Sequence, residues 1–64
     1  MARPRAATWD DTREQILAAA AQLFATRGYT ATTMNEVAAA SGVSKATLYH
    51  YVRDKHELLA MIAA

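Results

Sequence analysis

The sequence predicts an all-α fold, a small helical bundle of three helices followed by the start of a fourth. Apolar residues recur at the spacing of one buried helix face, as in Ile16, Ala20 and Phe24. Helix-start signals recur as well, in which an acid follows a capping residue by three positions, as at Thr33 and Glu36. The high alanine content also favours helix over strand.

The size of the chain limits what it can do. It has 64 residues and a formal net charge of +1, so we expect one small domain. Such a domain buries only about 60% of the surface that its unfolded chain exposes, which leaves little room for a substrate pocket. The sequence has no cysteine, which excludes a disulfide framework and a thiolate zinc site. Because His50 and His56 lack ligand spacing, we expect no metal and no cofactor.

No segment has the composition of a membrane span. The longest nearly apolar run, Ile16–Ala25, is interrupted by Gln22 and is too short to cross a bilayer. The basic start of the chain is not followed by the apolar stretch of a signal peptide. Together with the missing cysteines, this favours a cytoplasmic protein without a membrane partner.

Residues 1–9 are expected to form a flexible basic arm ahead of a domain of residues 10–64. Pro4 disfavours helix in this segment, and its apolar residues show no period. Arg3 and Arg5 carry positive charge there, with no acid among the first nine residues. The arm is therefore a candidate for contact with a negatively charged partner.

The first helix is predicted from about residue 11 to Arg27. Asp10 or Asp11 is expected to cap it, and Glu14 follows Asp11 at capping-box spacing. Gly28 comes next, and a glycine in this position supplies the left-handed residue that ends many helices.

The middle of the chain carries two short helical patterns joined by a tight turn. The second helix is predicted over Met34–Ser41 with Thr33 as its cap, and the third over about Lys45–Val52 with Ser44 as its cap. Gly42 relieves the steric cost of the sharp turn between them. Two helices joined in this way indicate a helix-turn-helix.

The predicted third helix has a small buried side and a large outer one. At 100° per residue, Leu48 and Val52 point inward with Tyr51 at the edge of that face. The outward positions are Lys45, Ala46, Thr47, Tyr49 and His50. No acid occurs in residues 37–53, so this outer face carries no negative charge. Nucleic-acid binding is therefore the leading hypothesis for this surface.

A fourth helix is predicted after Asp54, which caps it with Glu57 three residues on. Its end is crowded with large apolar residues: Leu58, Leu59, Met61 and Ile62. It stops at Ala64 without a glycine, a proline or a cationic last turn, as a helix does when it is cut. An exposed apolar cluster here gives the alternative function, a helical module that binds another protein.

The segment TTMNEVAAASGVSKATLYHYVRDKHELL, from Thr32 to Leu59, resembles the DNA-binding domain of the tetracycline-repressor (TetR) family of bacterial transcription regulators. The preceding ILAAAAQLFATRGYTATT resembles the first helix and loop of that family. The string TLYHYV-x-x-K-x-x-L follows Gly-Val-Ser at the family's spacing. Val52 stands where the family usually has phenylalanine, and Ala46 stands where it commonly has glycine. Both departures keep the character of the position, apolar and small respectively.

The resemblance implies a function and a set of contacts. The expected function is sequence-specific binding of a double-stranded, palindromic DNA operator, as the DNA-binding part of a ligand-responsive repressor. The residues expected at DNA are Thr33, Ser44, Lys45, Thr47, Tyr49, His50 and Lys55, with Arg3 and Arg5 as a possible minor-groove arm. Lys55 matches the family's phosphate-contacting lysine. Lys45 is placed to reach a base edge or a phosphate, and Thr47 to contact a base.

Family members carry a further helical domain that binds a small ligand and forms the dimer. The 64 residues contain none, so we expect a monomeric fragment of a protein that is a homodimer when complete. We do not expect an enzyme. Ser44, His50 and Asp54 lie within one short helical stretch and cannot converge as a catalytic triad must. Repression and activation are both compatible with these residues.

Overall fold

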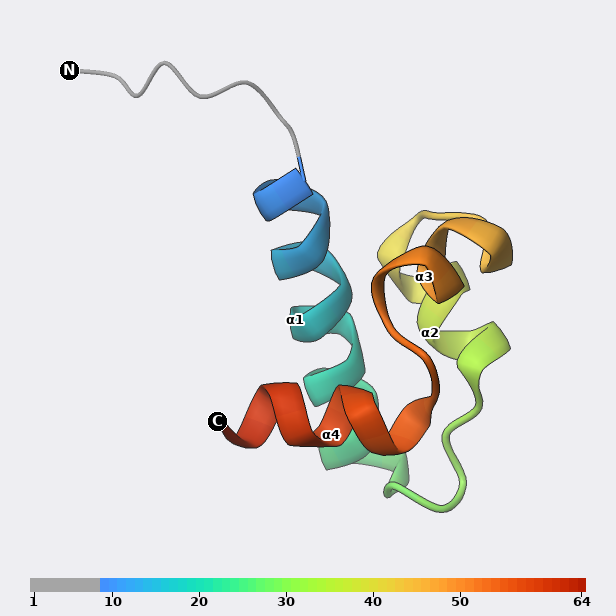
Figure 1. Ribbon diagram of the computed structural model, residues 1–64. Helices are drawn as coiled ribbons and strands as arrows, with labels where there is room; N and C mark the ends of the chain where they lie inside the picture. The colour runs from blue at the N-terminus through green and yellow to red at the C-terminus, as the bar shows by residue number, and fades with distance from the viewer. Residues whose placement is uncertain (1–8) are drawn as a thin grey trace, which may run out of the picture.

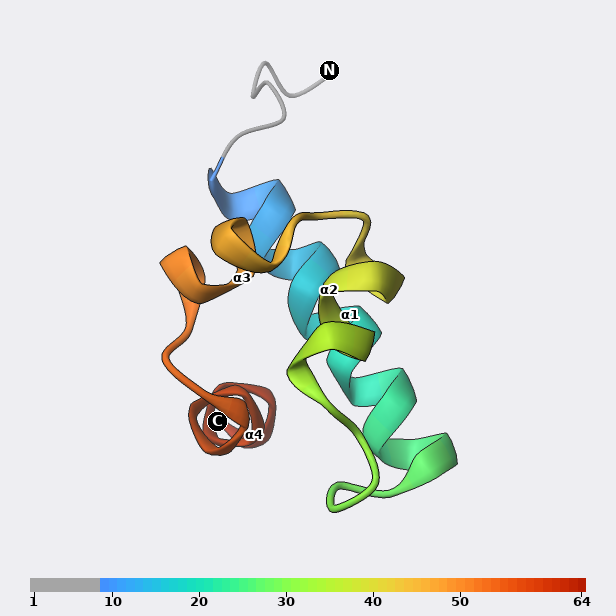
Figure 2. The same cartoon turned by 90° about the vertical axis from the view of Figure 1, so that its right-hand side faces the viewer.

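The computed structural model describes residues 9–64, with side chains from residue 11 onward. Within that range the chain forms four helices and no strand: α1 (Trp9–Arg27), α2 (Met34–Ser41), α3 (Lys45–Tyr51) and α4 (Lys55–Ala63). The long helix α1 packs against α2 and against α4, and α2 packs against α3 (Figures 1 and 2). The all-α prediction is thus confirmed. None of these described helices is long and apolar enough to cross a bilayer.

Two helix boundaries differ from those predicted. Helix α1 begins at Trp9, so Asp10 and Asp11 lie inside its first turn. The prediction that one of them caps the helix is therefore wrong, because acids are favoured in the first turn as well as at the cap and do not mark the start by themselves. Helix α3 ends one residue early, at Tyr51, and Val52 is extended with φ −137° and ψ 149°.

The predicted glycine signals are confirmed. Gly28 follows α1 with φ 92°, and Gly42 follows α2 with φ 76°, both in the left-handed region that favours glycine. The N–H of Gly42 donates to the carbonyl of Ala39 at 3.2 Å, and that of Val43 donates to Ala38 at 3.1 Å. This pair of hydrogen bonds is a Schellman motif, which satisfies the last carbonyls of α2 and directs the chain into α3.

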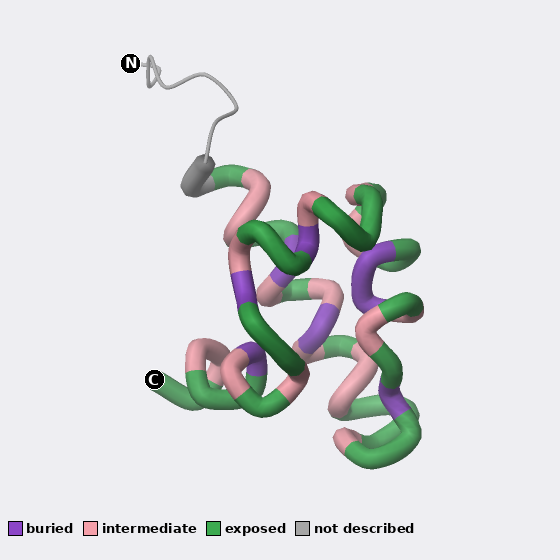
Figure 3. The backbone as a smooth tube through the Cα atoms, turned by 45° about the vertical axis from the view of Figure 1, so that its right-hand side comes forward, coloured by how far each residue is buried: buried purple, intermediate pink, exposed green. Residues whose placement is uncertain are grey.

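The core is small and draws on every helix. Its buried apolar residues are Ile16, Ala20, Val37, Ala38, Leu48, Val52 and Leu58. Figure 3 shows how little of the backbone is buried: short buried segments alternate with longer exposed and intermediate ones. Because so few side chains are fully buried, each one accounts for a large share of the stability.

The apolar end of α4 is not an exposed cluster. Leu58 is fully buried, and Met61 and Ile62 pack against the core. Leu59, at 38% exposure, is the large apolar residue of α4 that faces solvent. The expectation of a four-residue apolar surface is therefore wrong, because the helix turns most of these side chains toward α1.

Leu58 and Leu59 are adjacent leucines on one helix with opposite environments, which makes them a matched pair. We expect Leu58→Ala to lower the free energy of unfolding by about 2–5 kcal/mol, because it removes buried methyl groups and leaves a cavity. Leu59→Ala should cost about 1 kcal/mol or less, as a partly exposed position does. Urea titration followed by circular dichroism measures both. Equal losses for the two variants would contradict the burial described above.

Candidate nucleic-acid interface

Helix α3 is attached to the protein by few side chains. Leu48 is fully buried and Val52, just after the helix, is 2% exposed, as the helical wheel predicts. Tyr51 is half-buried and packs against the core. The rest of the helix faces out: Lys45, Ala46, Tyr49 and His50 are exposed and Thr47 is half-buried. The predicted division between a holding side and an outer side is therefore confirmed.

The first turn of α3 is held by Ser44. Its hydroxyl oxygen accepts the N–H of Thr47 at 3.0 Å, which is the hydrogen bond of an N-cap. The same hydroxyl donates to Oγ1 of Thr47, also at 3.0 Å. Ser44 thus fixes the side chain of Thr47 as well as its backbone. The Thr47 hydroxyl keeps its own proton, which it can donate to a partner.

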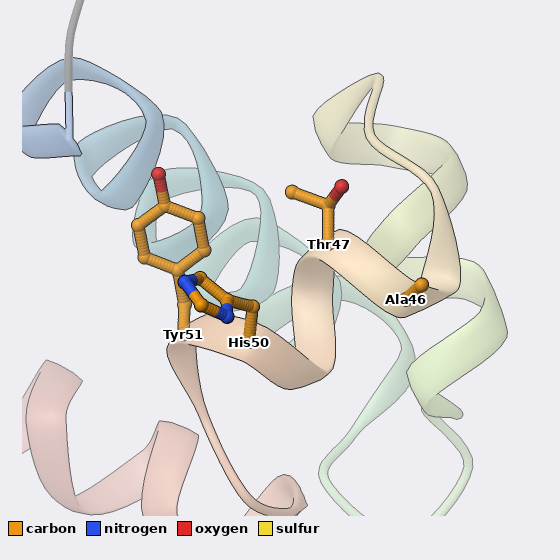
Figure 4. A pocket seen from close by; sticks show the side chains of 4 residues that line it. All are labelled: Ala46, Thr47, His50 and Tyr51. Atoms are coloured by element: carbon orange, nitrogen blue, oxygen red, sulfur yellow. The ribbon is translucent and has the colours of Figure 1, made fainter.

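An open hollow of about 410 Å³ lies along the outer side of α3, lined by Ala46, Thr47, His50 and Tyr51. Figure 4 shows the side chains of Thr47, His50 and Tyr51 projecting from the helix in a similar direction. The rings of His50 and Tyr51 meet edge to face, with centroids 5.9 Å apart and planes at 88°. Methyl groups, ring edges and polar atoms therefore lie side by side in one accessible recess.

The start of α2 forms a second exposed polar region. The Thr33 hydroxyl accepts the N–H of Glu36 at 3.2 Å, and Oε1 of Glu36 accepts the N–H of Thr33 at 3.0 Å. These reciprocal hydrogen bonds make the predicted capping box. Arg27, at the end of α1, pairs with the other carboxylate oxygen of Glu36 at 2.8 Å. The acid next to Thr33 is thereby offset by a neighbouring cation.

Lys55 is the first residue of α4, and its side chain is directed away from the outer face of α3. Its ammonium donates to the backbone carbonyls of Tyr29 at 2.8 Å and Thr32 at 2.9 Å, with Thr30 at 3.4 Å. It also lies 4.5 Å from the centroid of the Tyr29 ring. The structure therefore directs this predicted phosphate ligand toward the loop between α1 and α2.

Sequence reasoning overlooked two residues in that loop. Thr32 is fully buried, and its hydroxyl donates to the carbonyls of Gly28 at 2.8 Å and Leu23 at 3.3 Å. The Tyr29 ring packs against Phe24 with centroids 5.2 Å apart. Their partners Gly28, Leu23 and Phe24 lie four to nine residues earlier, at the end of α1 and the start of the loop. Arg3 and Arg5 lie outside the described residues.

The described residues contain no group of three His, Cys, Asp or Glu side chains that could hold a metal ion. The acid-free stretch predicted from the sequence includes all of α3, so its exposed face carries Lys45 and no carboxylate of its own. The fold and this surface together define a helix-turn-helix protein.

Comparison with known proteins identifies the family. Residues 16–62, most of the chain, match the family described as "Bacterial regulatory proteins, tetR family". The chain belongs to the tetR family, and the resemblance stated from the sequence is confirmed. No solved structure matches it significantly.

Curated relatives agree with this assignment. The chain is 43% identical over 53 residues to the uncharacterised HTH-type transcriptional regulator YxaF of Bacillus subtilis, covering 83% of this chain and 28% of that protein. It is 36% identical over 62 residues to the HTH-type transcriptional regulator AcrR of Shigella flexneri, covering 97% and 29%. It is 47% identical over 49 residues to the HTH-type transcriptional activator FasR of Mycolicibacterium smegmatis, covering 77% and 22%. The chain thus spans less than a third of the length of these relatives.

The cap of α3 can be tested without any ligand. We expect Ser44→Ala to lower the free energy of unfolding by about 0.5–2 kcal/mol, because it leaves the Thr47 N–H without its acceptor. Ser41→Ala is the matched control. The hydroxyl of Ser41 donates to the Val37 carbonyl at 2.6 Å, a bond back to the preceding helical turn that adds little stability. Thermal unfolding of both variants measures the difference, and an unchanged stability of the Ser44→Ala variant would show that Ser44 does not stabilise α3.

Proposed function

We propose that the chain is the DNA-binding part of a ligand-responsive bacterial transcriptional repressor, and that α3 enters the major groove of its operator. The observation that carries this proposal is the attachment of α3 mainly by Leu48 and Val52, which leaves an outer face that is exposed at Lys45, Ala46, Tyr49 and His50 and free of acid. A helix of seven residues is roughly 10 Å long. The major groove of B-DNA is about 12 Å wide and accepts one helix.

The bases are proposed to contact the first residue of α3 and the residues that line its hollow. Lys45 is its first residue, and the N-terminal residues of a recognition helix are those that contact base edges. An ammonium there can donate to O6 and N7 of guanine. Thr47 and Ala46 line the hollow, where methyl groups suit the methyl of thymine. Ser44 contributes by holding Thr47 in place.

Phosphate contacts flank this reading surface. Tyr49 is 44% exposed and His50 is exposed, and both offer hydrogen-bond donors on the outer side of α3. Thr33 offers a hydroxyl at the start of α2, beside an acid that Arg27 offsets. Arg3 and Arg5 are proposed to enter an adjacent minor groove, where a narrow A-tract attracts arginine.

The complete protein is proposed to act as a homodimer in the cytoplasm. Two copies of α3 would lie about 34–36 Å apart and read the two halves of a palindromic operator. A bound dimer would repress by occluding the promoter, and a ligand held by the rest of the protein would release it by changing that separation. The name of the relative FasR describes an activator, so the same DNA-binding unit is compatible with either sign of regulation. The isolated chain is proposed to be a monomer with weak affinity, because one half-site supplies few phosphate contacts.

The alternative, a helical module that binds another protein, has less support. It depends on an apolar surface of α4, but Leu58 is fully buried and Met61 and Ile62 pack against the core. The matched family consists of regulatory proteins. The two functions also differ in their response to salt, since phosphate contacts release counterions and apolar contacts do not.

DNA binding and its salt dependence can be measured with the 64-residue chain and a labelled random-sequence duplex. We expect the association constant to fall steeply between about 50 and 200 mM salt, with a slope set by the number of neutralised phosphates. Fluorescence anisotropy reports this directly. The absence of any salt-dependent association with the duplex would overturn DNA binding.

Base reading requires duplexes that the chain itself selects from a randomised pool. On these, Lys45→Ala should weaken binding by about 1–3 kcal/mol and relax the preference at one position. Tyr49→Ala should weaken binding to selected and random duplexes alike, as the loss of a phosphate contact does. Gln22→Ala, at an exposed position of α1, is the control and should change neither. Unchanged affinities for the Lys45 and Tyr49 variants would refute the assigned contacts.

A further inference from the structure

We propose that Arg53, which lies between α3 and α4, binds a DNA phosphate at the C-terminal end of the recognition helix. The inference rests on the proposed function, because it adds a contact to the surface by which α3 is proposed to enter the major groove. It adds to the phosphate contact that the family resemblance implies for Lys55 and does not replace that contact.

The backbone after α3 directs the side chain of Arg53 outward. Val52 is extended, with φ −137° and ψ 149°, and its side chain is packed into the core at 2% exposure. Successive side chains of an extended segment point to opposite sides. Arg53 therefore points away from the core, and its side chain is 82% exposed. The outer face of α3 is likewise turned away from the buried Leu48, so the guanidinium can reach a molecule bound on that face.

The backbone of Arg53 is held in place by the start of α4. Its N–H donates to Oε1 of Glu57 at 2.6 Å. The N–H of Glu57 in turn donates to Oδ1 of Asp54, the cap of α4, at 2.8 Å. A fixed backbone reduces the ordering that binding requires, because only the side chain of Arg53 has to be immobilised.

The guanidinium itself is only weakly held. Its Nε lies 4.0 Å from Oε1 of Glu57, and that oxygen already accepts the N–H of Arg53. A long ion pair between exposed side chains contributes little stability. The planar guanidinium has five N–H donors in a fork that matches the oxygens of a phosphate. A phosphate can therefore replace Glu57 at the guanidinium while the backbone hydrogen bond stays in place.

The position of Arg53 along the chain suits a contact at the border of the groove. The acid-free residues 37–53 contain one lysine and one arginine, Lys45 and Arg53, which stand at opposite ends of α3. The helix is roughly 10 Å long and the extended Val52 adds about 3 Å. The segment between the two cations is thus about as long as the major groove is wide, roughly 12 Å. Lys45 can meet a base at one end while Arg53 meets the phosphate strand at the other.

Arg53→Gln tests this contact by removing the charge. We expect it to weaken binding to a labelled random-sequence duplex about fivefold to tenfold near 100 mM salt, and to reduce the salt slope by about 0.9, as the loss of one phosphate contact does. Duplexes that the chain selects from a randomised pool should lose affinity by the same factor, because a phosphate contact carries no sequence information. Arg53→Lys keeps the charge and should retain the slope. Fluorescence anisotropy measures each association constant.

Two further variants separate a contact from a general effect of charge. Arg13→Gln, at a half-buried position of α1, removes one positive charge away from α3 and should retain the wild-type slope. Glu57→Gln keeps an oxygen acceptor for the N–H of Arg53 and removes the carboxylate that competes for the guanidinium. It should strengthen binding in the wild type and have a smaller effect in the Arg53→Gln background, since the two residues then act through one contact. Circular dichroism verifies that each variant is folded at the temperature of measurement.

A reduced slope in Arg53→Gln that is retained in Arg53→Lys and in Arg13→Gln would support the proposal. An unchanged slope in Arg53→Gln, or an equal reduction in Arg13→Gln, would overturn it and leave the proposed function in place. If the wild-type chain shows no salt-dependent association with the duplex, the proposed function fails and the contact of Arg53 fails with it.

Discussion

The burial of Leu48 is the interaction on which the rest of the structure depends. This side chain is fully enclosed in a core that also contains Ile16, Val37 and Leu58. Helix α3 is only seven residues long and is too short to be stable by itself in water, so its conformation is maintained by this packing and by its cap. The outer face of α3 can be almost entirely exposed because so few residues are needed to attach it.

A second constraint acts on the loop between α1 and α2, where hydrogen bonds replace apolar packing. Buried backbone groups must be paired, and carbonyls of this loop are paired with side-chain donors. Thr32 supplies a hydroxyl from within the loop and Lys55 supplies an ammonium from α4. The entry into α2 is therefore fixed by polar contacts, whereas the exit toward α3 is fixed by the left-handed Gly42 and the packing of Val43.

Much of this arrangement was predictable because its causes are local. The caps at Thr33 and Ser44, the turn at Gly42 and the inward direction of Leu48 each depend on residues within four positions. The start of α1 was misplaced because acids in a first turn resemble acids at a cap. The contacts of Lys55 were not predictable for a different reason. Its partners lie 23 to 26 residues away, and a lysine in the first turn of a helix gives no sign of which distant carbonyls it meets.

The separation between holding and outward residues also explains why membership of a family does not specify an operator. The positions that make the fold, such as Leu48 and Val52, are buried and constrained in size and polarity. The positions proposed to read bases, Lys45, Ala46 and Thr47, are exposed or half-buried, so substitutions there cost the fold little. Sequence preference can therefore change while the scaffold is retained. Buried loop residues such as Thr32 belong with the scaffold in this respect, since they fix the backbone and are not exposed to a base.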